Sequence, residues 1–193
     1  MMPGACQLAL NRREGSKSCH LSASYLSLII LAGFWLACGR LDSAGLGFLA
    51  WNRTPARQLL KAVGAGVVAA LVVSWVFRDL RTGSLPALPE IWMGITFGPL
   101  AEELIFRGML FHGLMLLLRR WLAKPGWIAV VVIAGAFAAS HLVKAGITPW
   151  QIVAIFLTGC LYGWLRLDSG STAPPLLAHA AYNAVLFGIA FLR

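Results

Sequence analysis

Three full charges interrupt a long apolar run in the stretch Pro99-Leu100-Ala101-Glu102-Glu103-Leu104-Ile105-Phe106-Arg107-Gly108. The run itself extends from Ile91 to Leu118. Charged side chains are rare within membrane-spanning helices, where they normally face a bundle interior or a water-filled cavity and mark a functional site. The stretch therefore predicts a buried polar site, and we interpret the other apolar segments as helices around it.

The composition is that of a membrane protein. Hydrophobic residues make up 59% of the 193 residues and charged residues 12%, whereas a soluble domain contains about 45–50% apolar residues. The mean hydropathy is +0.77. With about 20 residues per span, the chain has room for about six or seven membrane helices and no separate soluble domain. The sequence thus predicts an all-α fold, a polytopic transmembrane helix bundle of about six to seven spans.

Neither the net charge of +9 nor the cysteines indicate another class of protein. The basic residues mostly flank apolar runs, a placement that suits contact with lipid headgroups rather than nucleic acid. The four cysteines show no C-x-x-C spacing, so they predict neither a zinc ribbon nor a disulfide framework. We expect them to be free thiols, and we expect the bilayer to be the main surrounding of the chain.

The chain divides into a short tail and one membrane domain. Residues 1–20 are polar and basic, and we expect a disordered tail there. The apolar run Leu21 to Cys38 follows a basic flank, as a secretory signal does, but its length also suits a first membrane anchor. Residues 21–193 then form a single membrane-embedded helical domain. Later spans are expected at residues 59–77, 91–118, 127–143, 150–167 and 174–192, separated by loops that contain Gly and Pro.

The sides of the membrane follow from this order of spans. The tail and the loop from Arg78 to Glu90 should lie on one side, with the connector from Gly39 to Gln58 on the other. Lys and Arg are divided almost evenly between the two sides, so the positive-inside rule does not orient the protein.

The span from Ile91 to Leu118 is too long for a straight crossing. At 1.5 Å per residue it would measure about 42 Å, against a hydrocarbon core of about 30 Å. It must tilt, protrude or break, and Gly98-Pro99 supplies a break because proline cannot donate the helical hydrogen bond. Glu102 would lie about 16 Å into this span and His179 about 8 Å into a span entered from the other side. For the two to meet, the helices must tilt, or residues 150–167 must not cross fully.

The two glutamates are expected to have different surroundings. On a helix, Glu103 and Arg107 stand four residues apart on one face, in the order that favours an ion pair. Glu102 is rotated about 140° from Arg107, so the arginine does not easily pair with it. One carboxylate is then paired and ionised, and the other faces an apolar cavity where it suits a general base. The alternative is a buried network that only holds helices together.

Two further polar insertions lie in apolar segments. His141 follows Phe137 by one helical turn, and Asn183 follows His179 by four residues, so the imidazole and the amide share a helix face. Each histidine alone would more often be a helix-packing hydrogen bonder. Together with Glu102 they form a set that can activate water and hold an oxyanion.

The order of these residues resembles a known family. Glu-Glu-x-x-x-Arg at residues 102–107, Phe-x-x-x-His at 137–141 and His-x-x-x-Asn at 179–183 are similar to the motifs of the CPBP intramembrane endopeptidases, which include the CAAX prenyl endopeptidases and the bacterial Abi proteins. The resemblance covers about residues 91–192, with motifs in 99–107, 137–141 and 179–183.

The resemblance implies hydrolysis of a peptide bond of a membrane-anchored protein or peptide. It assigns Glu102 and His141 to the activation of water, His179 and Asn183 to the oxyanion, and Glu103 and Arg107 to the organisation of the site. From the residues themselves we expect no cofactor. The chain is shorter than the eukaryotic prenyl endopeptidases it resembles, which favours a bacterial sorting, maturation or immunity role in the inner membrane.

Two alternatives stay open at this point. Glu102, His141 and His179 are also a possible Zn²⁺ set, because two histidines and a carboxylate leave one coordination position for water. His-Glu-x-x-His is absent from the sequence, and the asparagine favours hydrogen bonding over metal ligation. A non-catalytic transporter or assembly partner could use the same polar cluster for proton relay or ligand binding, but it gives no reason for these motifs to occur in this order.

Overall fold

Every regular element in the described part of the chain is a helix, as the apolar spans predict. The computed structural model describes residues 54–77, 87–144 and 146–192, all of which belong to one unit, residues 45–193. The predicted tail, the predicted first span and most of the loops at 39–58 and 78–90 lie outside the described residues. The elements are α2 (Ala56–Val76), α3 (Leu88–Ile95), α4 (Phe97–Glu103), η4 (Leu104–Leu110), α5 (Phe111–Leu118), α6 (Gly126–Ser140), α7 (Pro149–Ser169) and α8 (Ala173–Phe191).

Three of these helices, α2, α7 and α8, are long and apolar enough to cross a bilayer, and α6 is a shorter apolar helix. Large apolar side chains lie exposed on their outer surfaces, among them Leu60, Trp75, Val131 and Leu157. Such exposure is unfavourable in water and expected against lipid. The chain is therefore an integral membrane protein. The expected count of six to seven spans stays a prediction, because the first expected span is not among the described residues.

Helix α2 packs along α8 through a stripe of small residues. Ala62, Gly66, Ala70 and Ser74 recur every four residues and are all buried. A Cβ atom at Gly66 would collide with the carbonyl group of Ala178. Small residues at this spacing let the backbones of membrane helices approach closely. This contact fixes the position of the first half of α8 at Ala178, and the next residue is His179.

Helices α6 and α7 approach each other in a similar way. A Cβ atom at Gly159 would lie 3.2 Å from the Cβ of Ala134, and one at Gly163 would lie 3.0 Å from Val130 Cγ1. The two glycines are four residues apart on one face of α7, so the α7 backbone lies against α6 over more than one turn.

The predicted span from residue 91 to 118 is broken, but not at Gly98-Pro99. The chain departs from helical geometry at Thr96, with φ −113° and ψ −77°. Its hydroxyl donates to the carbonyl oxygen of Trp92 at 2.6 Å, a back-bond that bends helices. Pro99 then lies in the first turn of α4, where a backbone N–H has no acceptor within the helix and proline costs little.

A second irregularity follows at once, because η4 is a π-helix. π-helical turns are rare, and they occur frequently at functional sites. The carbonyl oxygen of Arg107, inside this turn, accepts a hydrogen bond of 3.0 Å from Nε of Arg166 on α7. A contact from a neighbouring helix thus satisfies backbone within the irregular segment.

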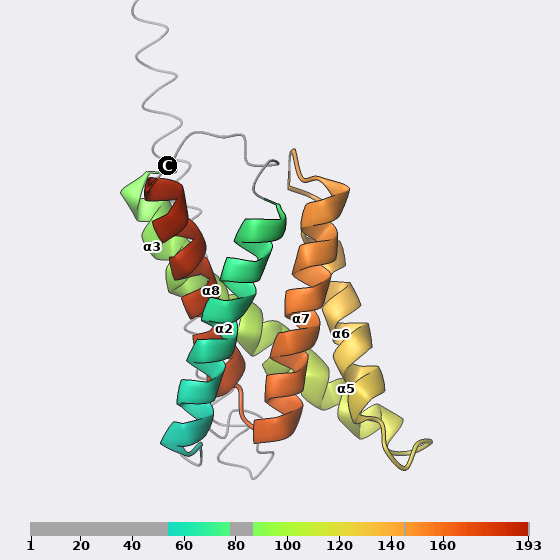
Figure 1. Cartoon of the computed structure of the whole chain (residues 1–193). Helices are drawn as coiled ribbons and strands as arrows, with labels where there is room; N and C mark the ends of the chain where they lie inside the picture. The colour runs from blue at the N-terminus through green and yellow to red at the C-terminus, as the bar shows by residue number, and fades with distance from the viewer. Residues whose placement is uncertain (1–53, 78–86, 145, 193) are drawn as a thin grey trace, which may run out of the picture. The chain divides into compact units, whose positions relative to one another are not determined.

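The broken segment also tilts. Figure 1 shows α2, α6 and α7 roughly parallel to one another, while the segment from α3 through α5 crosses them obliquely. The end of α2, the end of α6 and the start of α7 lie at one end of the helices, and the connections from α5 to α6 and from α7 to α8 lie at the other. The sequence placed Glu102 and His179 at different depths in their spans. With the segment tilted, the two side chains meet, and Oε2 of Glu102 lies 3.7 Å from Nε2 of His179.

Candidate active site

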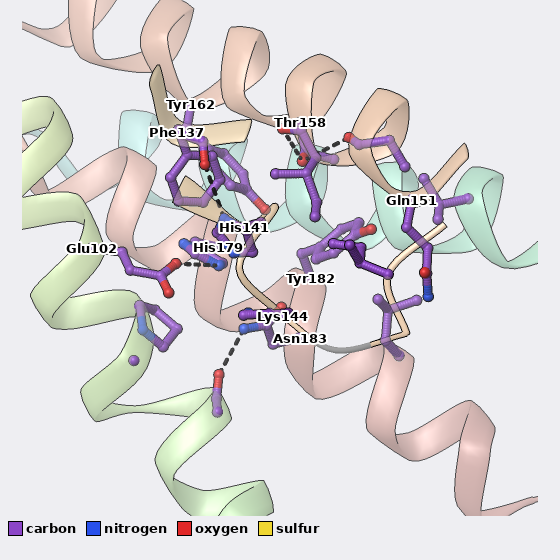
Figure 2. Close-up of a pocket in the computed structure, with 18 of the residues that line it drawn as sticks. Glu102, Phe137, His141, Lys144, Gln151, Thr158, Tyr162, His179, Tyr182 and Asn183 are labelled. Atoms are coloured by element: carbon purple, nitrogen blue, oxygen red, sulfur yellow. Dashed lines mark hydrogen bonds and ion pairs between the residues drawn. The ribbon is translucent and has the colours of Figure 1, made fainter. Parts of the chain in front are cut away.

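A cavity of about 540 Å³ lies at the break between α3 and α4. Glu102, His141, His179 and Asn183 all line it, although they come from three separate parts of the sequence. Figure 2 shows these four side chains together with their aromatic neighbours. Thus α4, the end of α6 and α8 bring together the four residues that the sequence assigned to chemistry. The cavity also has an apolar part, formed by Val73, Phe77, Ile155, Leu186 and Phe187.

Beneath the cavity, Glu103 joins two of the motifs. Its Oε1 accepts a hydrogen bond of 3.0 Å from Nη1 of Arg107, and both side chains are completely buried. The same oxygen lies 2.9 Å from Nδ1 of His179. The predicted ion pair is confirmed, and the carboxylate also fixes the ring of a histidine 76 residues further along the chain. A carboxylate in this position sets which ring nitrogen carries a proton.

The guanidinium of Arg107 is held on several sides. Its Nη2 donates to the carbonyl oxygen of Gly159 at 3.1 Å. Its central carbon lies 4.4 Å from the ring centroid of Phe137 and 5.4 Å from that of Tyr162. Such cation–π contacts stabilise a desolvated cation by about 2 kcal/mol or more. Gly159 therefore has two functions, because it allows close packing and presents its carbonyl group to the buried arginine.

Glu102 has the different surroundings that the sequence predicted. Its side chain is 32% exposed and lines the cavity, whereas the side chain of Glu103 is completely buried. Oε2 of Glu102 lies 3.7 Å from Nε2 of His179. The two nitrogens of the His179 ring thus face the two glutamates, with Nδ1 toward Glu103 and Nε2 toward Glu102.

His141 ends α6 and is oriented by the backbone of its own helix. Its Nδ1 lies 2.9 Å from the carbonyl oxygen of Phe137. A carbonyl oxygen can only accept, so Nδ1 carries the proton and Nε2 keeps a free lone pair. The ring also packs edge-on against Phe137, with centroids 4.8 Å apart. The Phe-x-x-x-His spacing therefore places both an aromatic ring and a backbone acceptor beside this imidazole.

Asn183 lines the cavity but is not free within it. Its Nδ2 donates to the carbonyl oxygen of Gly94 at 2.6 Å, as Figure 2 shows. This bond links α8 to α3 just before the break. An amide nitrogen carries two hydrogens, so one remains available to a bound group. The anchoring role was not expected from the sequence.

Tyr162 is a residue of the site that sequence reasoning missed. It is 1% exposed, and its ring stacks on that of His179 with centroids 4.9 Å apart at an angle of 21°. Its hydroxyl is buried without a hydrogen-bond partner in the described part of the chain. The signal was present in the sequence, because Thr158, Tyr162 and Arg166 recur every four residues on a largely apolar helix. All three are buried.

The proposed zinc set can be compared with this geometry. Across residues 54–77, 87–144 and 146–192, no three His, Cys, Asp or Glu side chains form a group that could hold a metal ion. Of the candidate ligands, His179 has Nδ1 against Glu103, and His141 has Nδ1 against a carbonyl group.

Comparison with known proteins gives one match. The family model described as type II CAAX prenyl endopeptidase Rce1-like matches residues 84–185, more than half of the chain. The matched range begins before α3 and includes all three motifs. No curated protein and no solved structure matches the chain.

Proposed function

Since this chain belongs to the type II CAAX prenyl endopeptidase Rce1-like family, and is thus a CAAX-type protease of the membrane, we propose that it hydrolyses a peptide bond of a membrane-anchored substrate by a water that Glu102 and His141 activate. The observation that carries this proposal is the pair of glutamates in unlike surroundings. Glu103 is buried and paired with Arg107, while Glu102 faces the cavity. A carboxylate kept free of a permanent cation can take up a proton during the reaction.

In the first step of the proposed mechanism, the water oxygen attacks the carbonyl carbon of the scissile bond. One proton of the water passes to Glu102, and the other is held by the lone pair on Nε2 of His141. The electron pair of the carbonyl double bond moves to its oxygen, which becomes an oxyanion. In its doubly protonated form, His179 donates from Nδ1 to Glu103, and its Nε2–H, together with the second N–H of Asn183, stabilises this charge.

In the second step the oxyanion collapses and the carbonyl double bond forms again. The carbon–nitrogen bond breaks, and the proton held by Glu102 passes to the leaving amine. The products are a peptide with a new carboxyl group and a peptide with a new amino group, and the proton held by Nε2 of His141 passes to the amino group as the carboxyl group ionises. Glu103 and Arg107 are positioning residues. Glu103 holds the His179 ring toward Glu102, and Arg107 is paired with Glu103.

The family description supports a substrate class. A C-terminal Cys-aliphatic-aliphatic-X sequence is a signal for prenylation of the cysteine, and the apolar part of the cavity would suit an aliphatic segment. We further propose the bacterial inner membrane as the location and a mechanism without a metal cofactor. Zn²⁺ bound by Glu102, His141 and His179 is the alternative that the experiment below separates.

The test uses purified protein in liposomes and an internally quenched peptide that ends in Cys-aliphatic-aliphatic-X, in prenylated and unprenylated forms. We expect the wild-type protein to cleave at least one form and Glu102→Gln to cleave neither. The glutamine keeps the size and removes the base, so the protein should stay folded. Cleavage should persist in a chelator. Full activity of Glu102→Gln would refute the assignment of the base. Loss of activity in chelator that Zn²⁺ restores would replace the mechanism with the metal-dependent one, and no cleavage at all would favour a non-catalytic role.

A further inference from the structure

The cavity wall carries a cation as well as the carboxylate of Glu102. Among the described lining residues, Lys144 is the one lysine or arginine. It lies in the segment between α6 and α7, three residues after His141. The rest of the wall is formed by uncharged polar side chains, among them Gln151, Thr158 and Tyr182, by the histidines and Asn183, and by aromatic and apolar side chains.

The backbone places Lys144 at the cavity. Its N–H donates to the carbonyl oxygen of His141 at 3.0 Å, in the turn that ends α6. The lysine is therefore coupled to the position of a residue that we assign to water activation. Figure 2 shows its side chain among the lining residues, in the same region as Asn183.

Lys144 forms no ion pair within the described part of the protein. The ammonium group has no carboxylate partner there, although Glu102 belongs to the same cavity. The residue is exposed. By contrast, Lys61 is paired with Asp168 at 2.8 Å, and Arg107 is paired with Glu103. A cation at a cavity rim without such a partner can bind an anionic group that enters.

A substrate with a free C-terminus needs such a partner. Moving a carboxylate from water into a mostly apolar cavity is costly unless an opposite charge accompanies it. Glu102 makes the cost larger, because like charges repel strongly where the dielectric is low. A peptide whose reactive bond lies close to its terminal carboxylate must bring that charge near Glu102. A lysine suits the task, since its ammonium is a compact charge on a flexible stem.

We propose that Lys144 binds the terminal carboxylate of the substrate and so selects peptide bonds close to a free C-terminus. This inference rests on the proposed function and adds a specificity-determining residue to it. It differs from the ordinary role of an interfacial lysine, which is contact with lipid headgroups, because it requires a dependence on the chemistry of the substrate end.

The experiment compares three prenylated Cys-aliphatic-aliphatic-X peptides of one sequence. One has a free C-terminal carboxylate, one a C-terminal amide, and one a C-terminal amide with Asp as the last residue. For the wild type we expect kcat/KM to be about tenfold higher for the free acid than for the amide, as expected for a partly desolvated ion pair. In Lys144→Gln the value for the free acid should fall to that of the amide or below it, because the carboxylate then enters beside Glu102 without its cation. Lys124→Gln is the matched control, since this exposed lysine lies between α5 and α6 and does not line the cavity.

A binding measurement separates this inference from the proposed function. Dissociation constants of the same peptides for Glu102→Gln, and for Glu102→Gln combined with Lys144→Gln, report recognition without turnover. We expect the preference for the free acid in the first protein and its loss in the second. Equal binding of acid and amide by Glu102→Gln would overturn the proposal, as would an equal loss for both peptides on removal of Lys144, which would indicate a lipid contact. A preference for the Asp amide equal to that for the free acid would overturn the restriction to the C-terminus.

Discussion

Glu102 and Glu103 are neighbours in sequence but differ in burial and in their partners. Glu103 compensates the charge of Arg107 and also contacts His179, all within a region that excludes solvent. Glu102 borders the cavity, and the arginine does not depend on it. Substitution of the two residues by the same isostere should therefore affect folding very differently.

For Glu103→Gln we expect a loss of folded protein as well as of activity. The substitution leaves Arg107 as a buried cation without a carboxylate partner, and breaking a buried pair in this way costs about 3–5 kcal/mol. The melting temperature in detergent and the yield of monodisperse protein measure this effect, with Glu102→Gln as the matched control that should stay near the wild type. Equal stability of the two variants would contradict the division of roles.

Asn183 combines an anchor with a proposed catalytic donor. For Asn183→Ala we expect the rate constant of the chemical step to fall about 10²- to 10³-fold, the effect of removing one oxyanion donor. KM should barely change, because the donor acts mainly once the oxygen carries charge. Loss of the bond to Gly94 should also lower stability, by about 1–3 kcal/mol if the carbonyl group is left unpaired.

Single-turnover kinetics and thermal unfolding of Asn183→Ala distinguish the two roles. An unchanged rate with reduced stability would make Asn183 an anchor only. In Asn183→Asp, an ionised carboxylate would repel both the Gly94 carbonyl oxygen and the oxyanion, so activity should be lost at neutral pH.

At the scale of elements, the contact between α2 and α8 determines where His179 lies. Gly66 meets the carbonyl group of Ala178, and the next residue is the histidine. For Gly66→Ala we expect lower thermal stability and reduced cleavage, because the added Cβ forces the two helices apart. Gly64→Ala is the matched control on the same helix, since a Cβ there meets nothing within 4 Å. It should fold as well as the wild type, or slightly better, because alanine favours helix. Similar behaviour of the two variants in thermal unfolding and in the cleavage assay would refute this role of the contact.

The sequence predicted the elements that carry the site, and it missed how they meet. The pair of Glu103 and Arg107 followed from helical spacing, and the length of the long span predicted that it tilts, protrudes or breaks. The π-helical turn has no comparable signal, because the apolar pattern of residues 104–110 fits an α-helix equally well. The break lies at Thr96 and not at the predicted Gly98-Pro99, because proline is tolerated in the first turn of the helix that follows.

The periodicity of the sequence does not predict which residues of distant helices contact one another. Helical spacing on α8 shows that His179 and Asn183 share a face, but not that one contacts Glu103 and the other Gly94. Stacking of Tyr162 on His179 likewise depends on the close packing of α7. The sequence thus predicted which residues gather, while their partners depended on the tertiary structure.

At the scale of the whole molecule, the described helices present apolar side chains outward and enclose buried charges. A membrane protein gains little from the hydrophobic effect between its helices, so small-residue packing and satisfied polar groups must hold the bundle together. The same polar groups form the proposed active site. In this account the stability of the bundle and the position of its catalytic residues have a common origin in the network of Glu103, Arg107 and His179.

In the proposed mechanism, a water activated by Glu102 attacks the scissile bond directly, and no covalent intermediate forms. The most direct measurement is a single turnover of the quenched peptide in H₂¹⁸O, followed by mass spectrometry of the product and of the protein. We predict one ¹⁸O atom in the new carboxylate of the product, none in Glu102, and no product from Glu102→Gln. ¹⁸O in the Glu102 side chain would contradict the account, because it would indicate a covalent intermediate, as would undiminished product formation by Glu102→Gln.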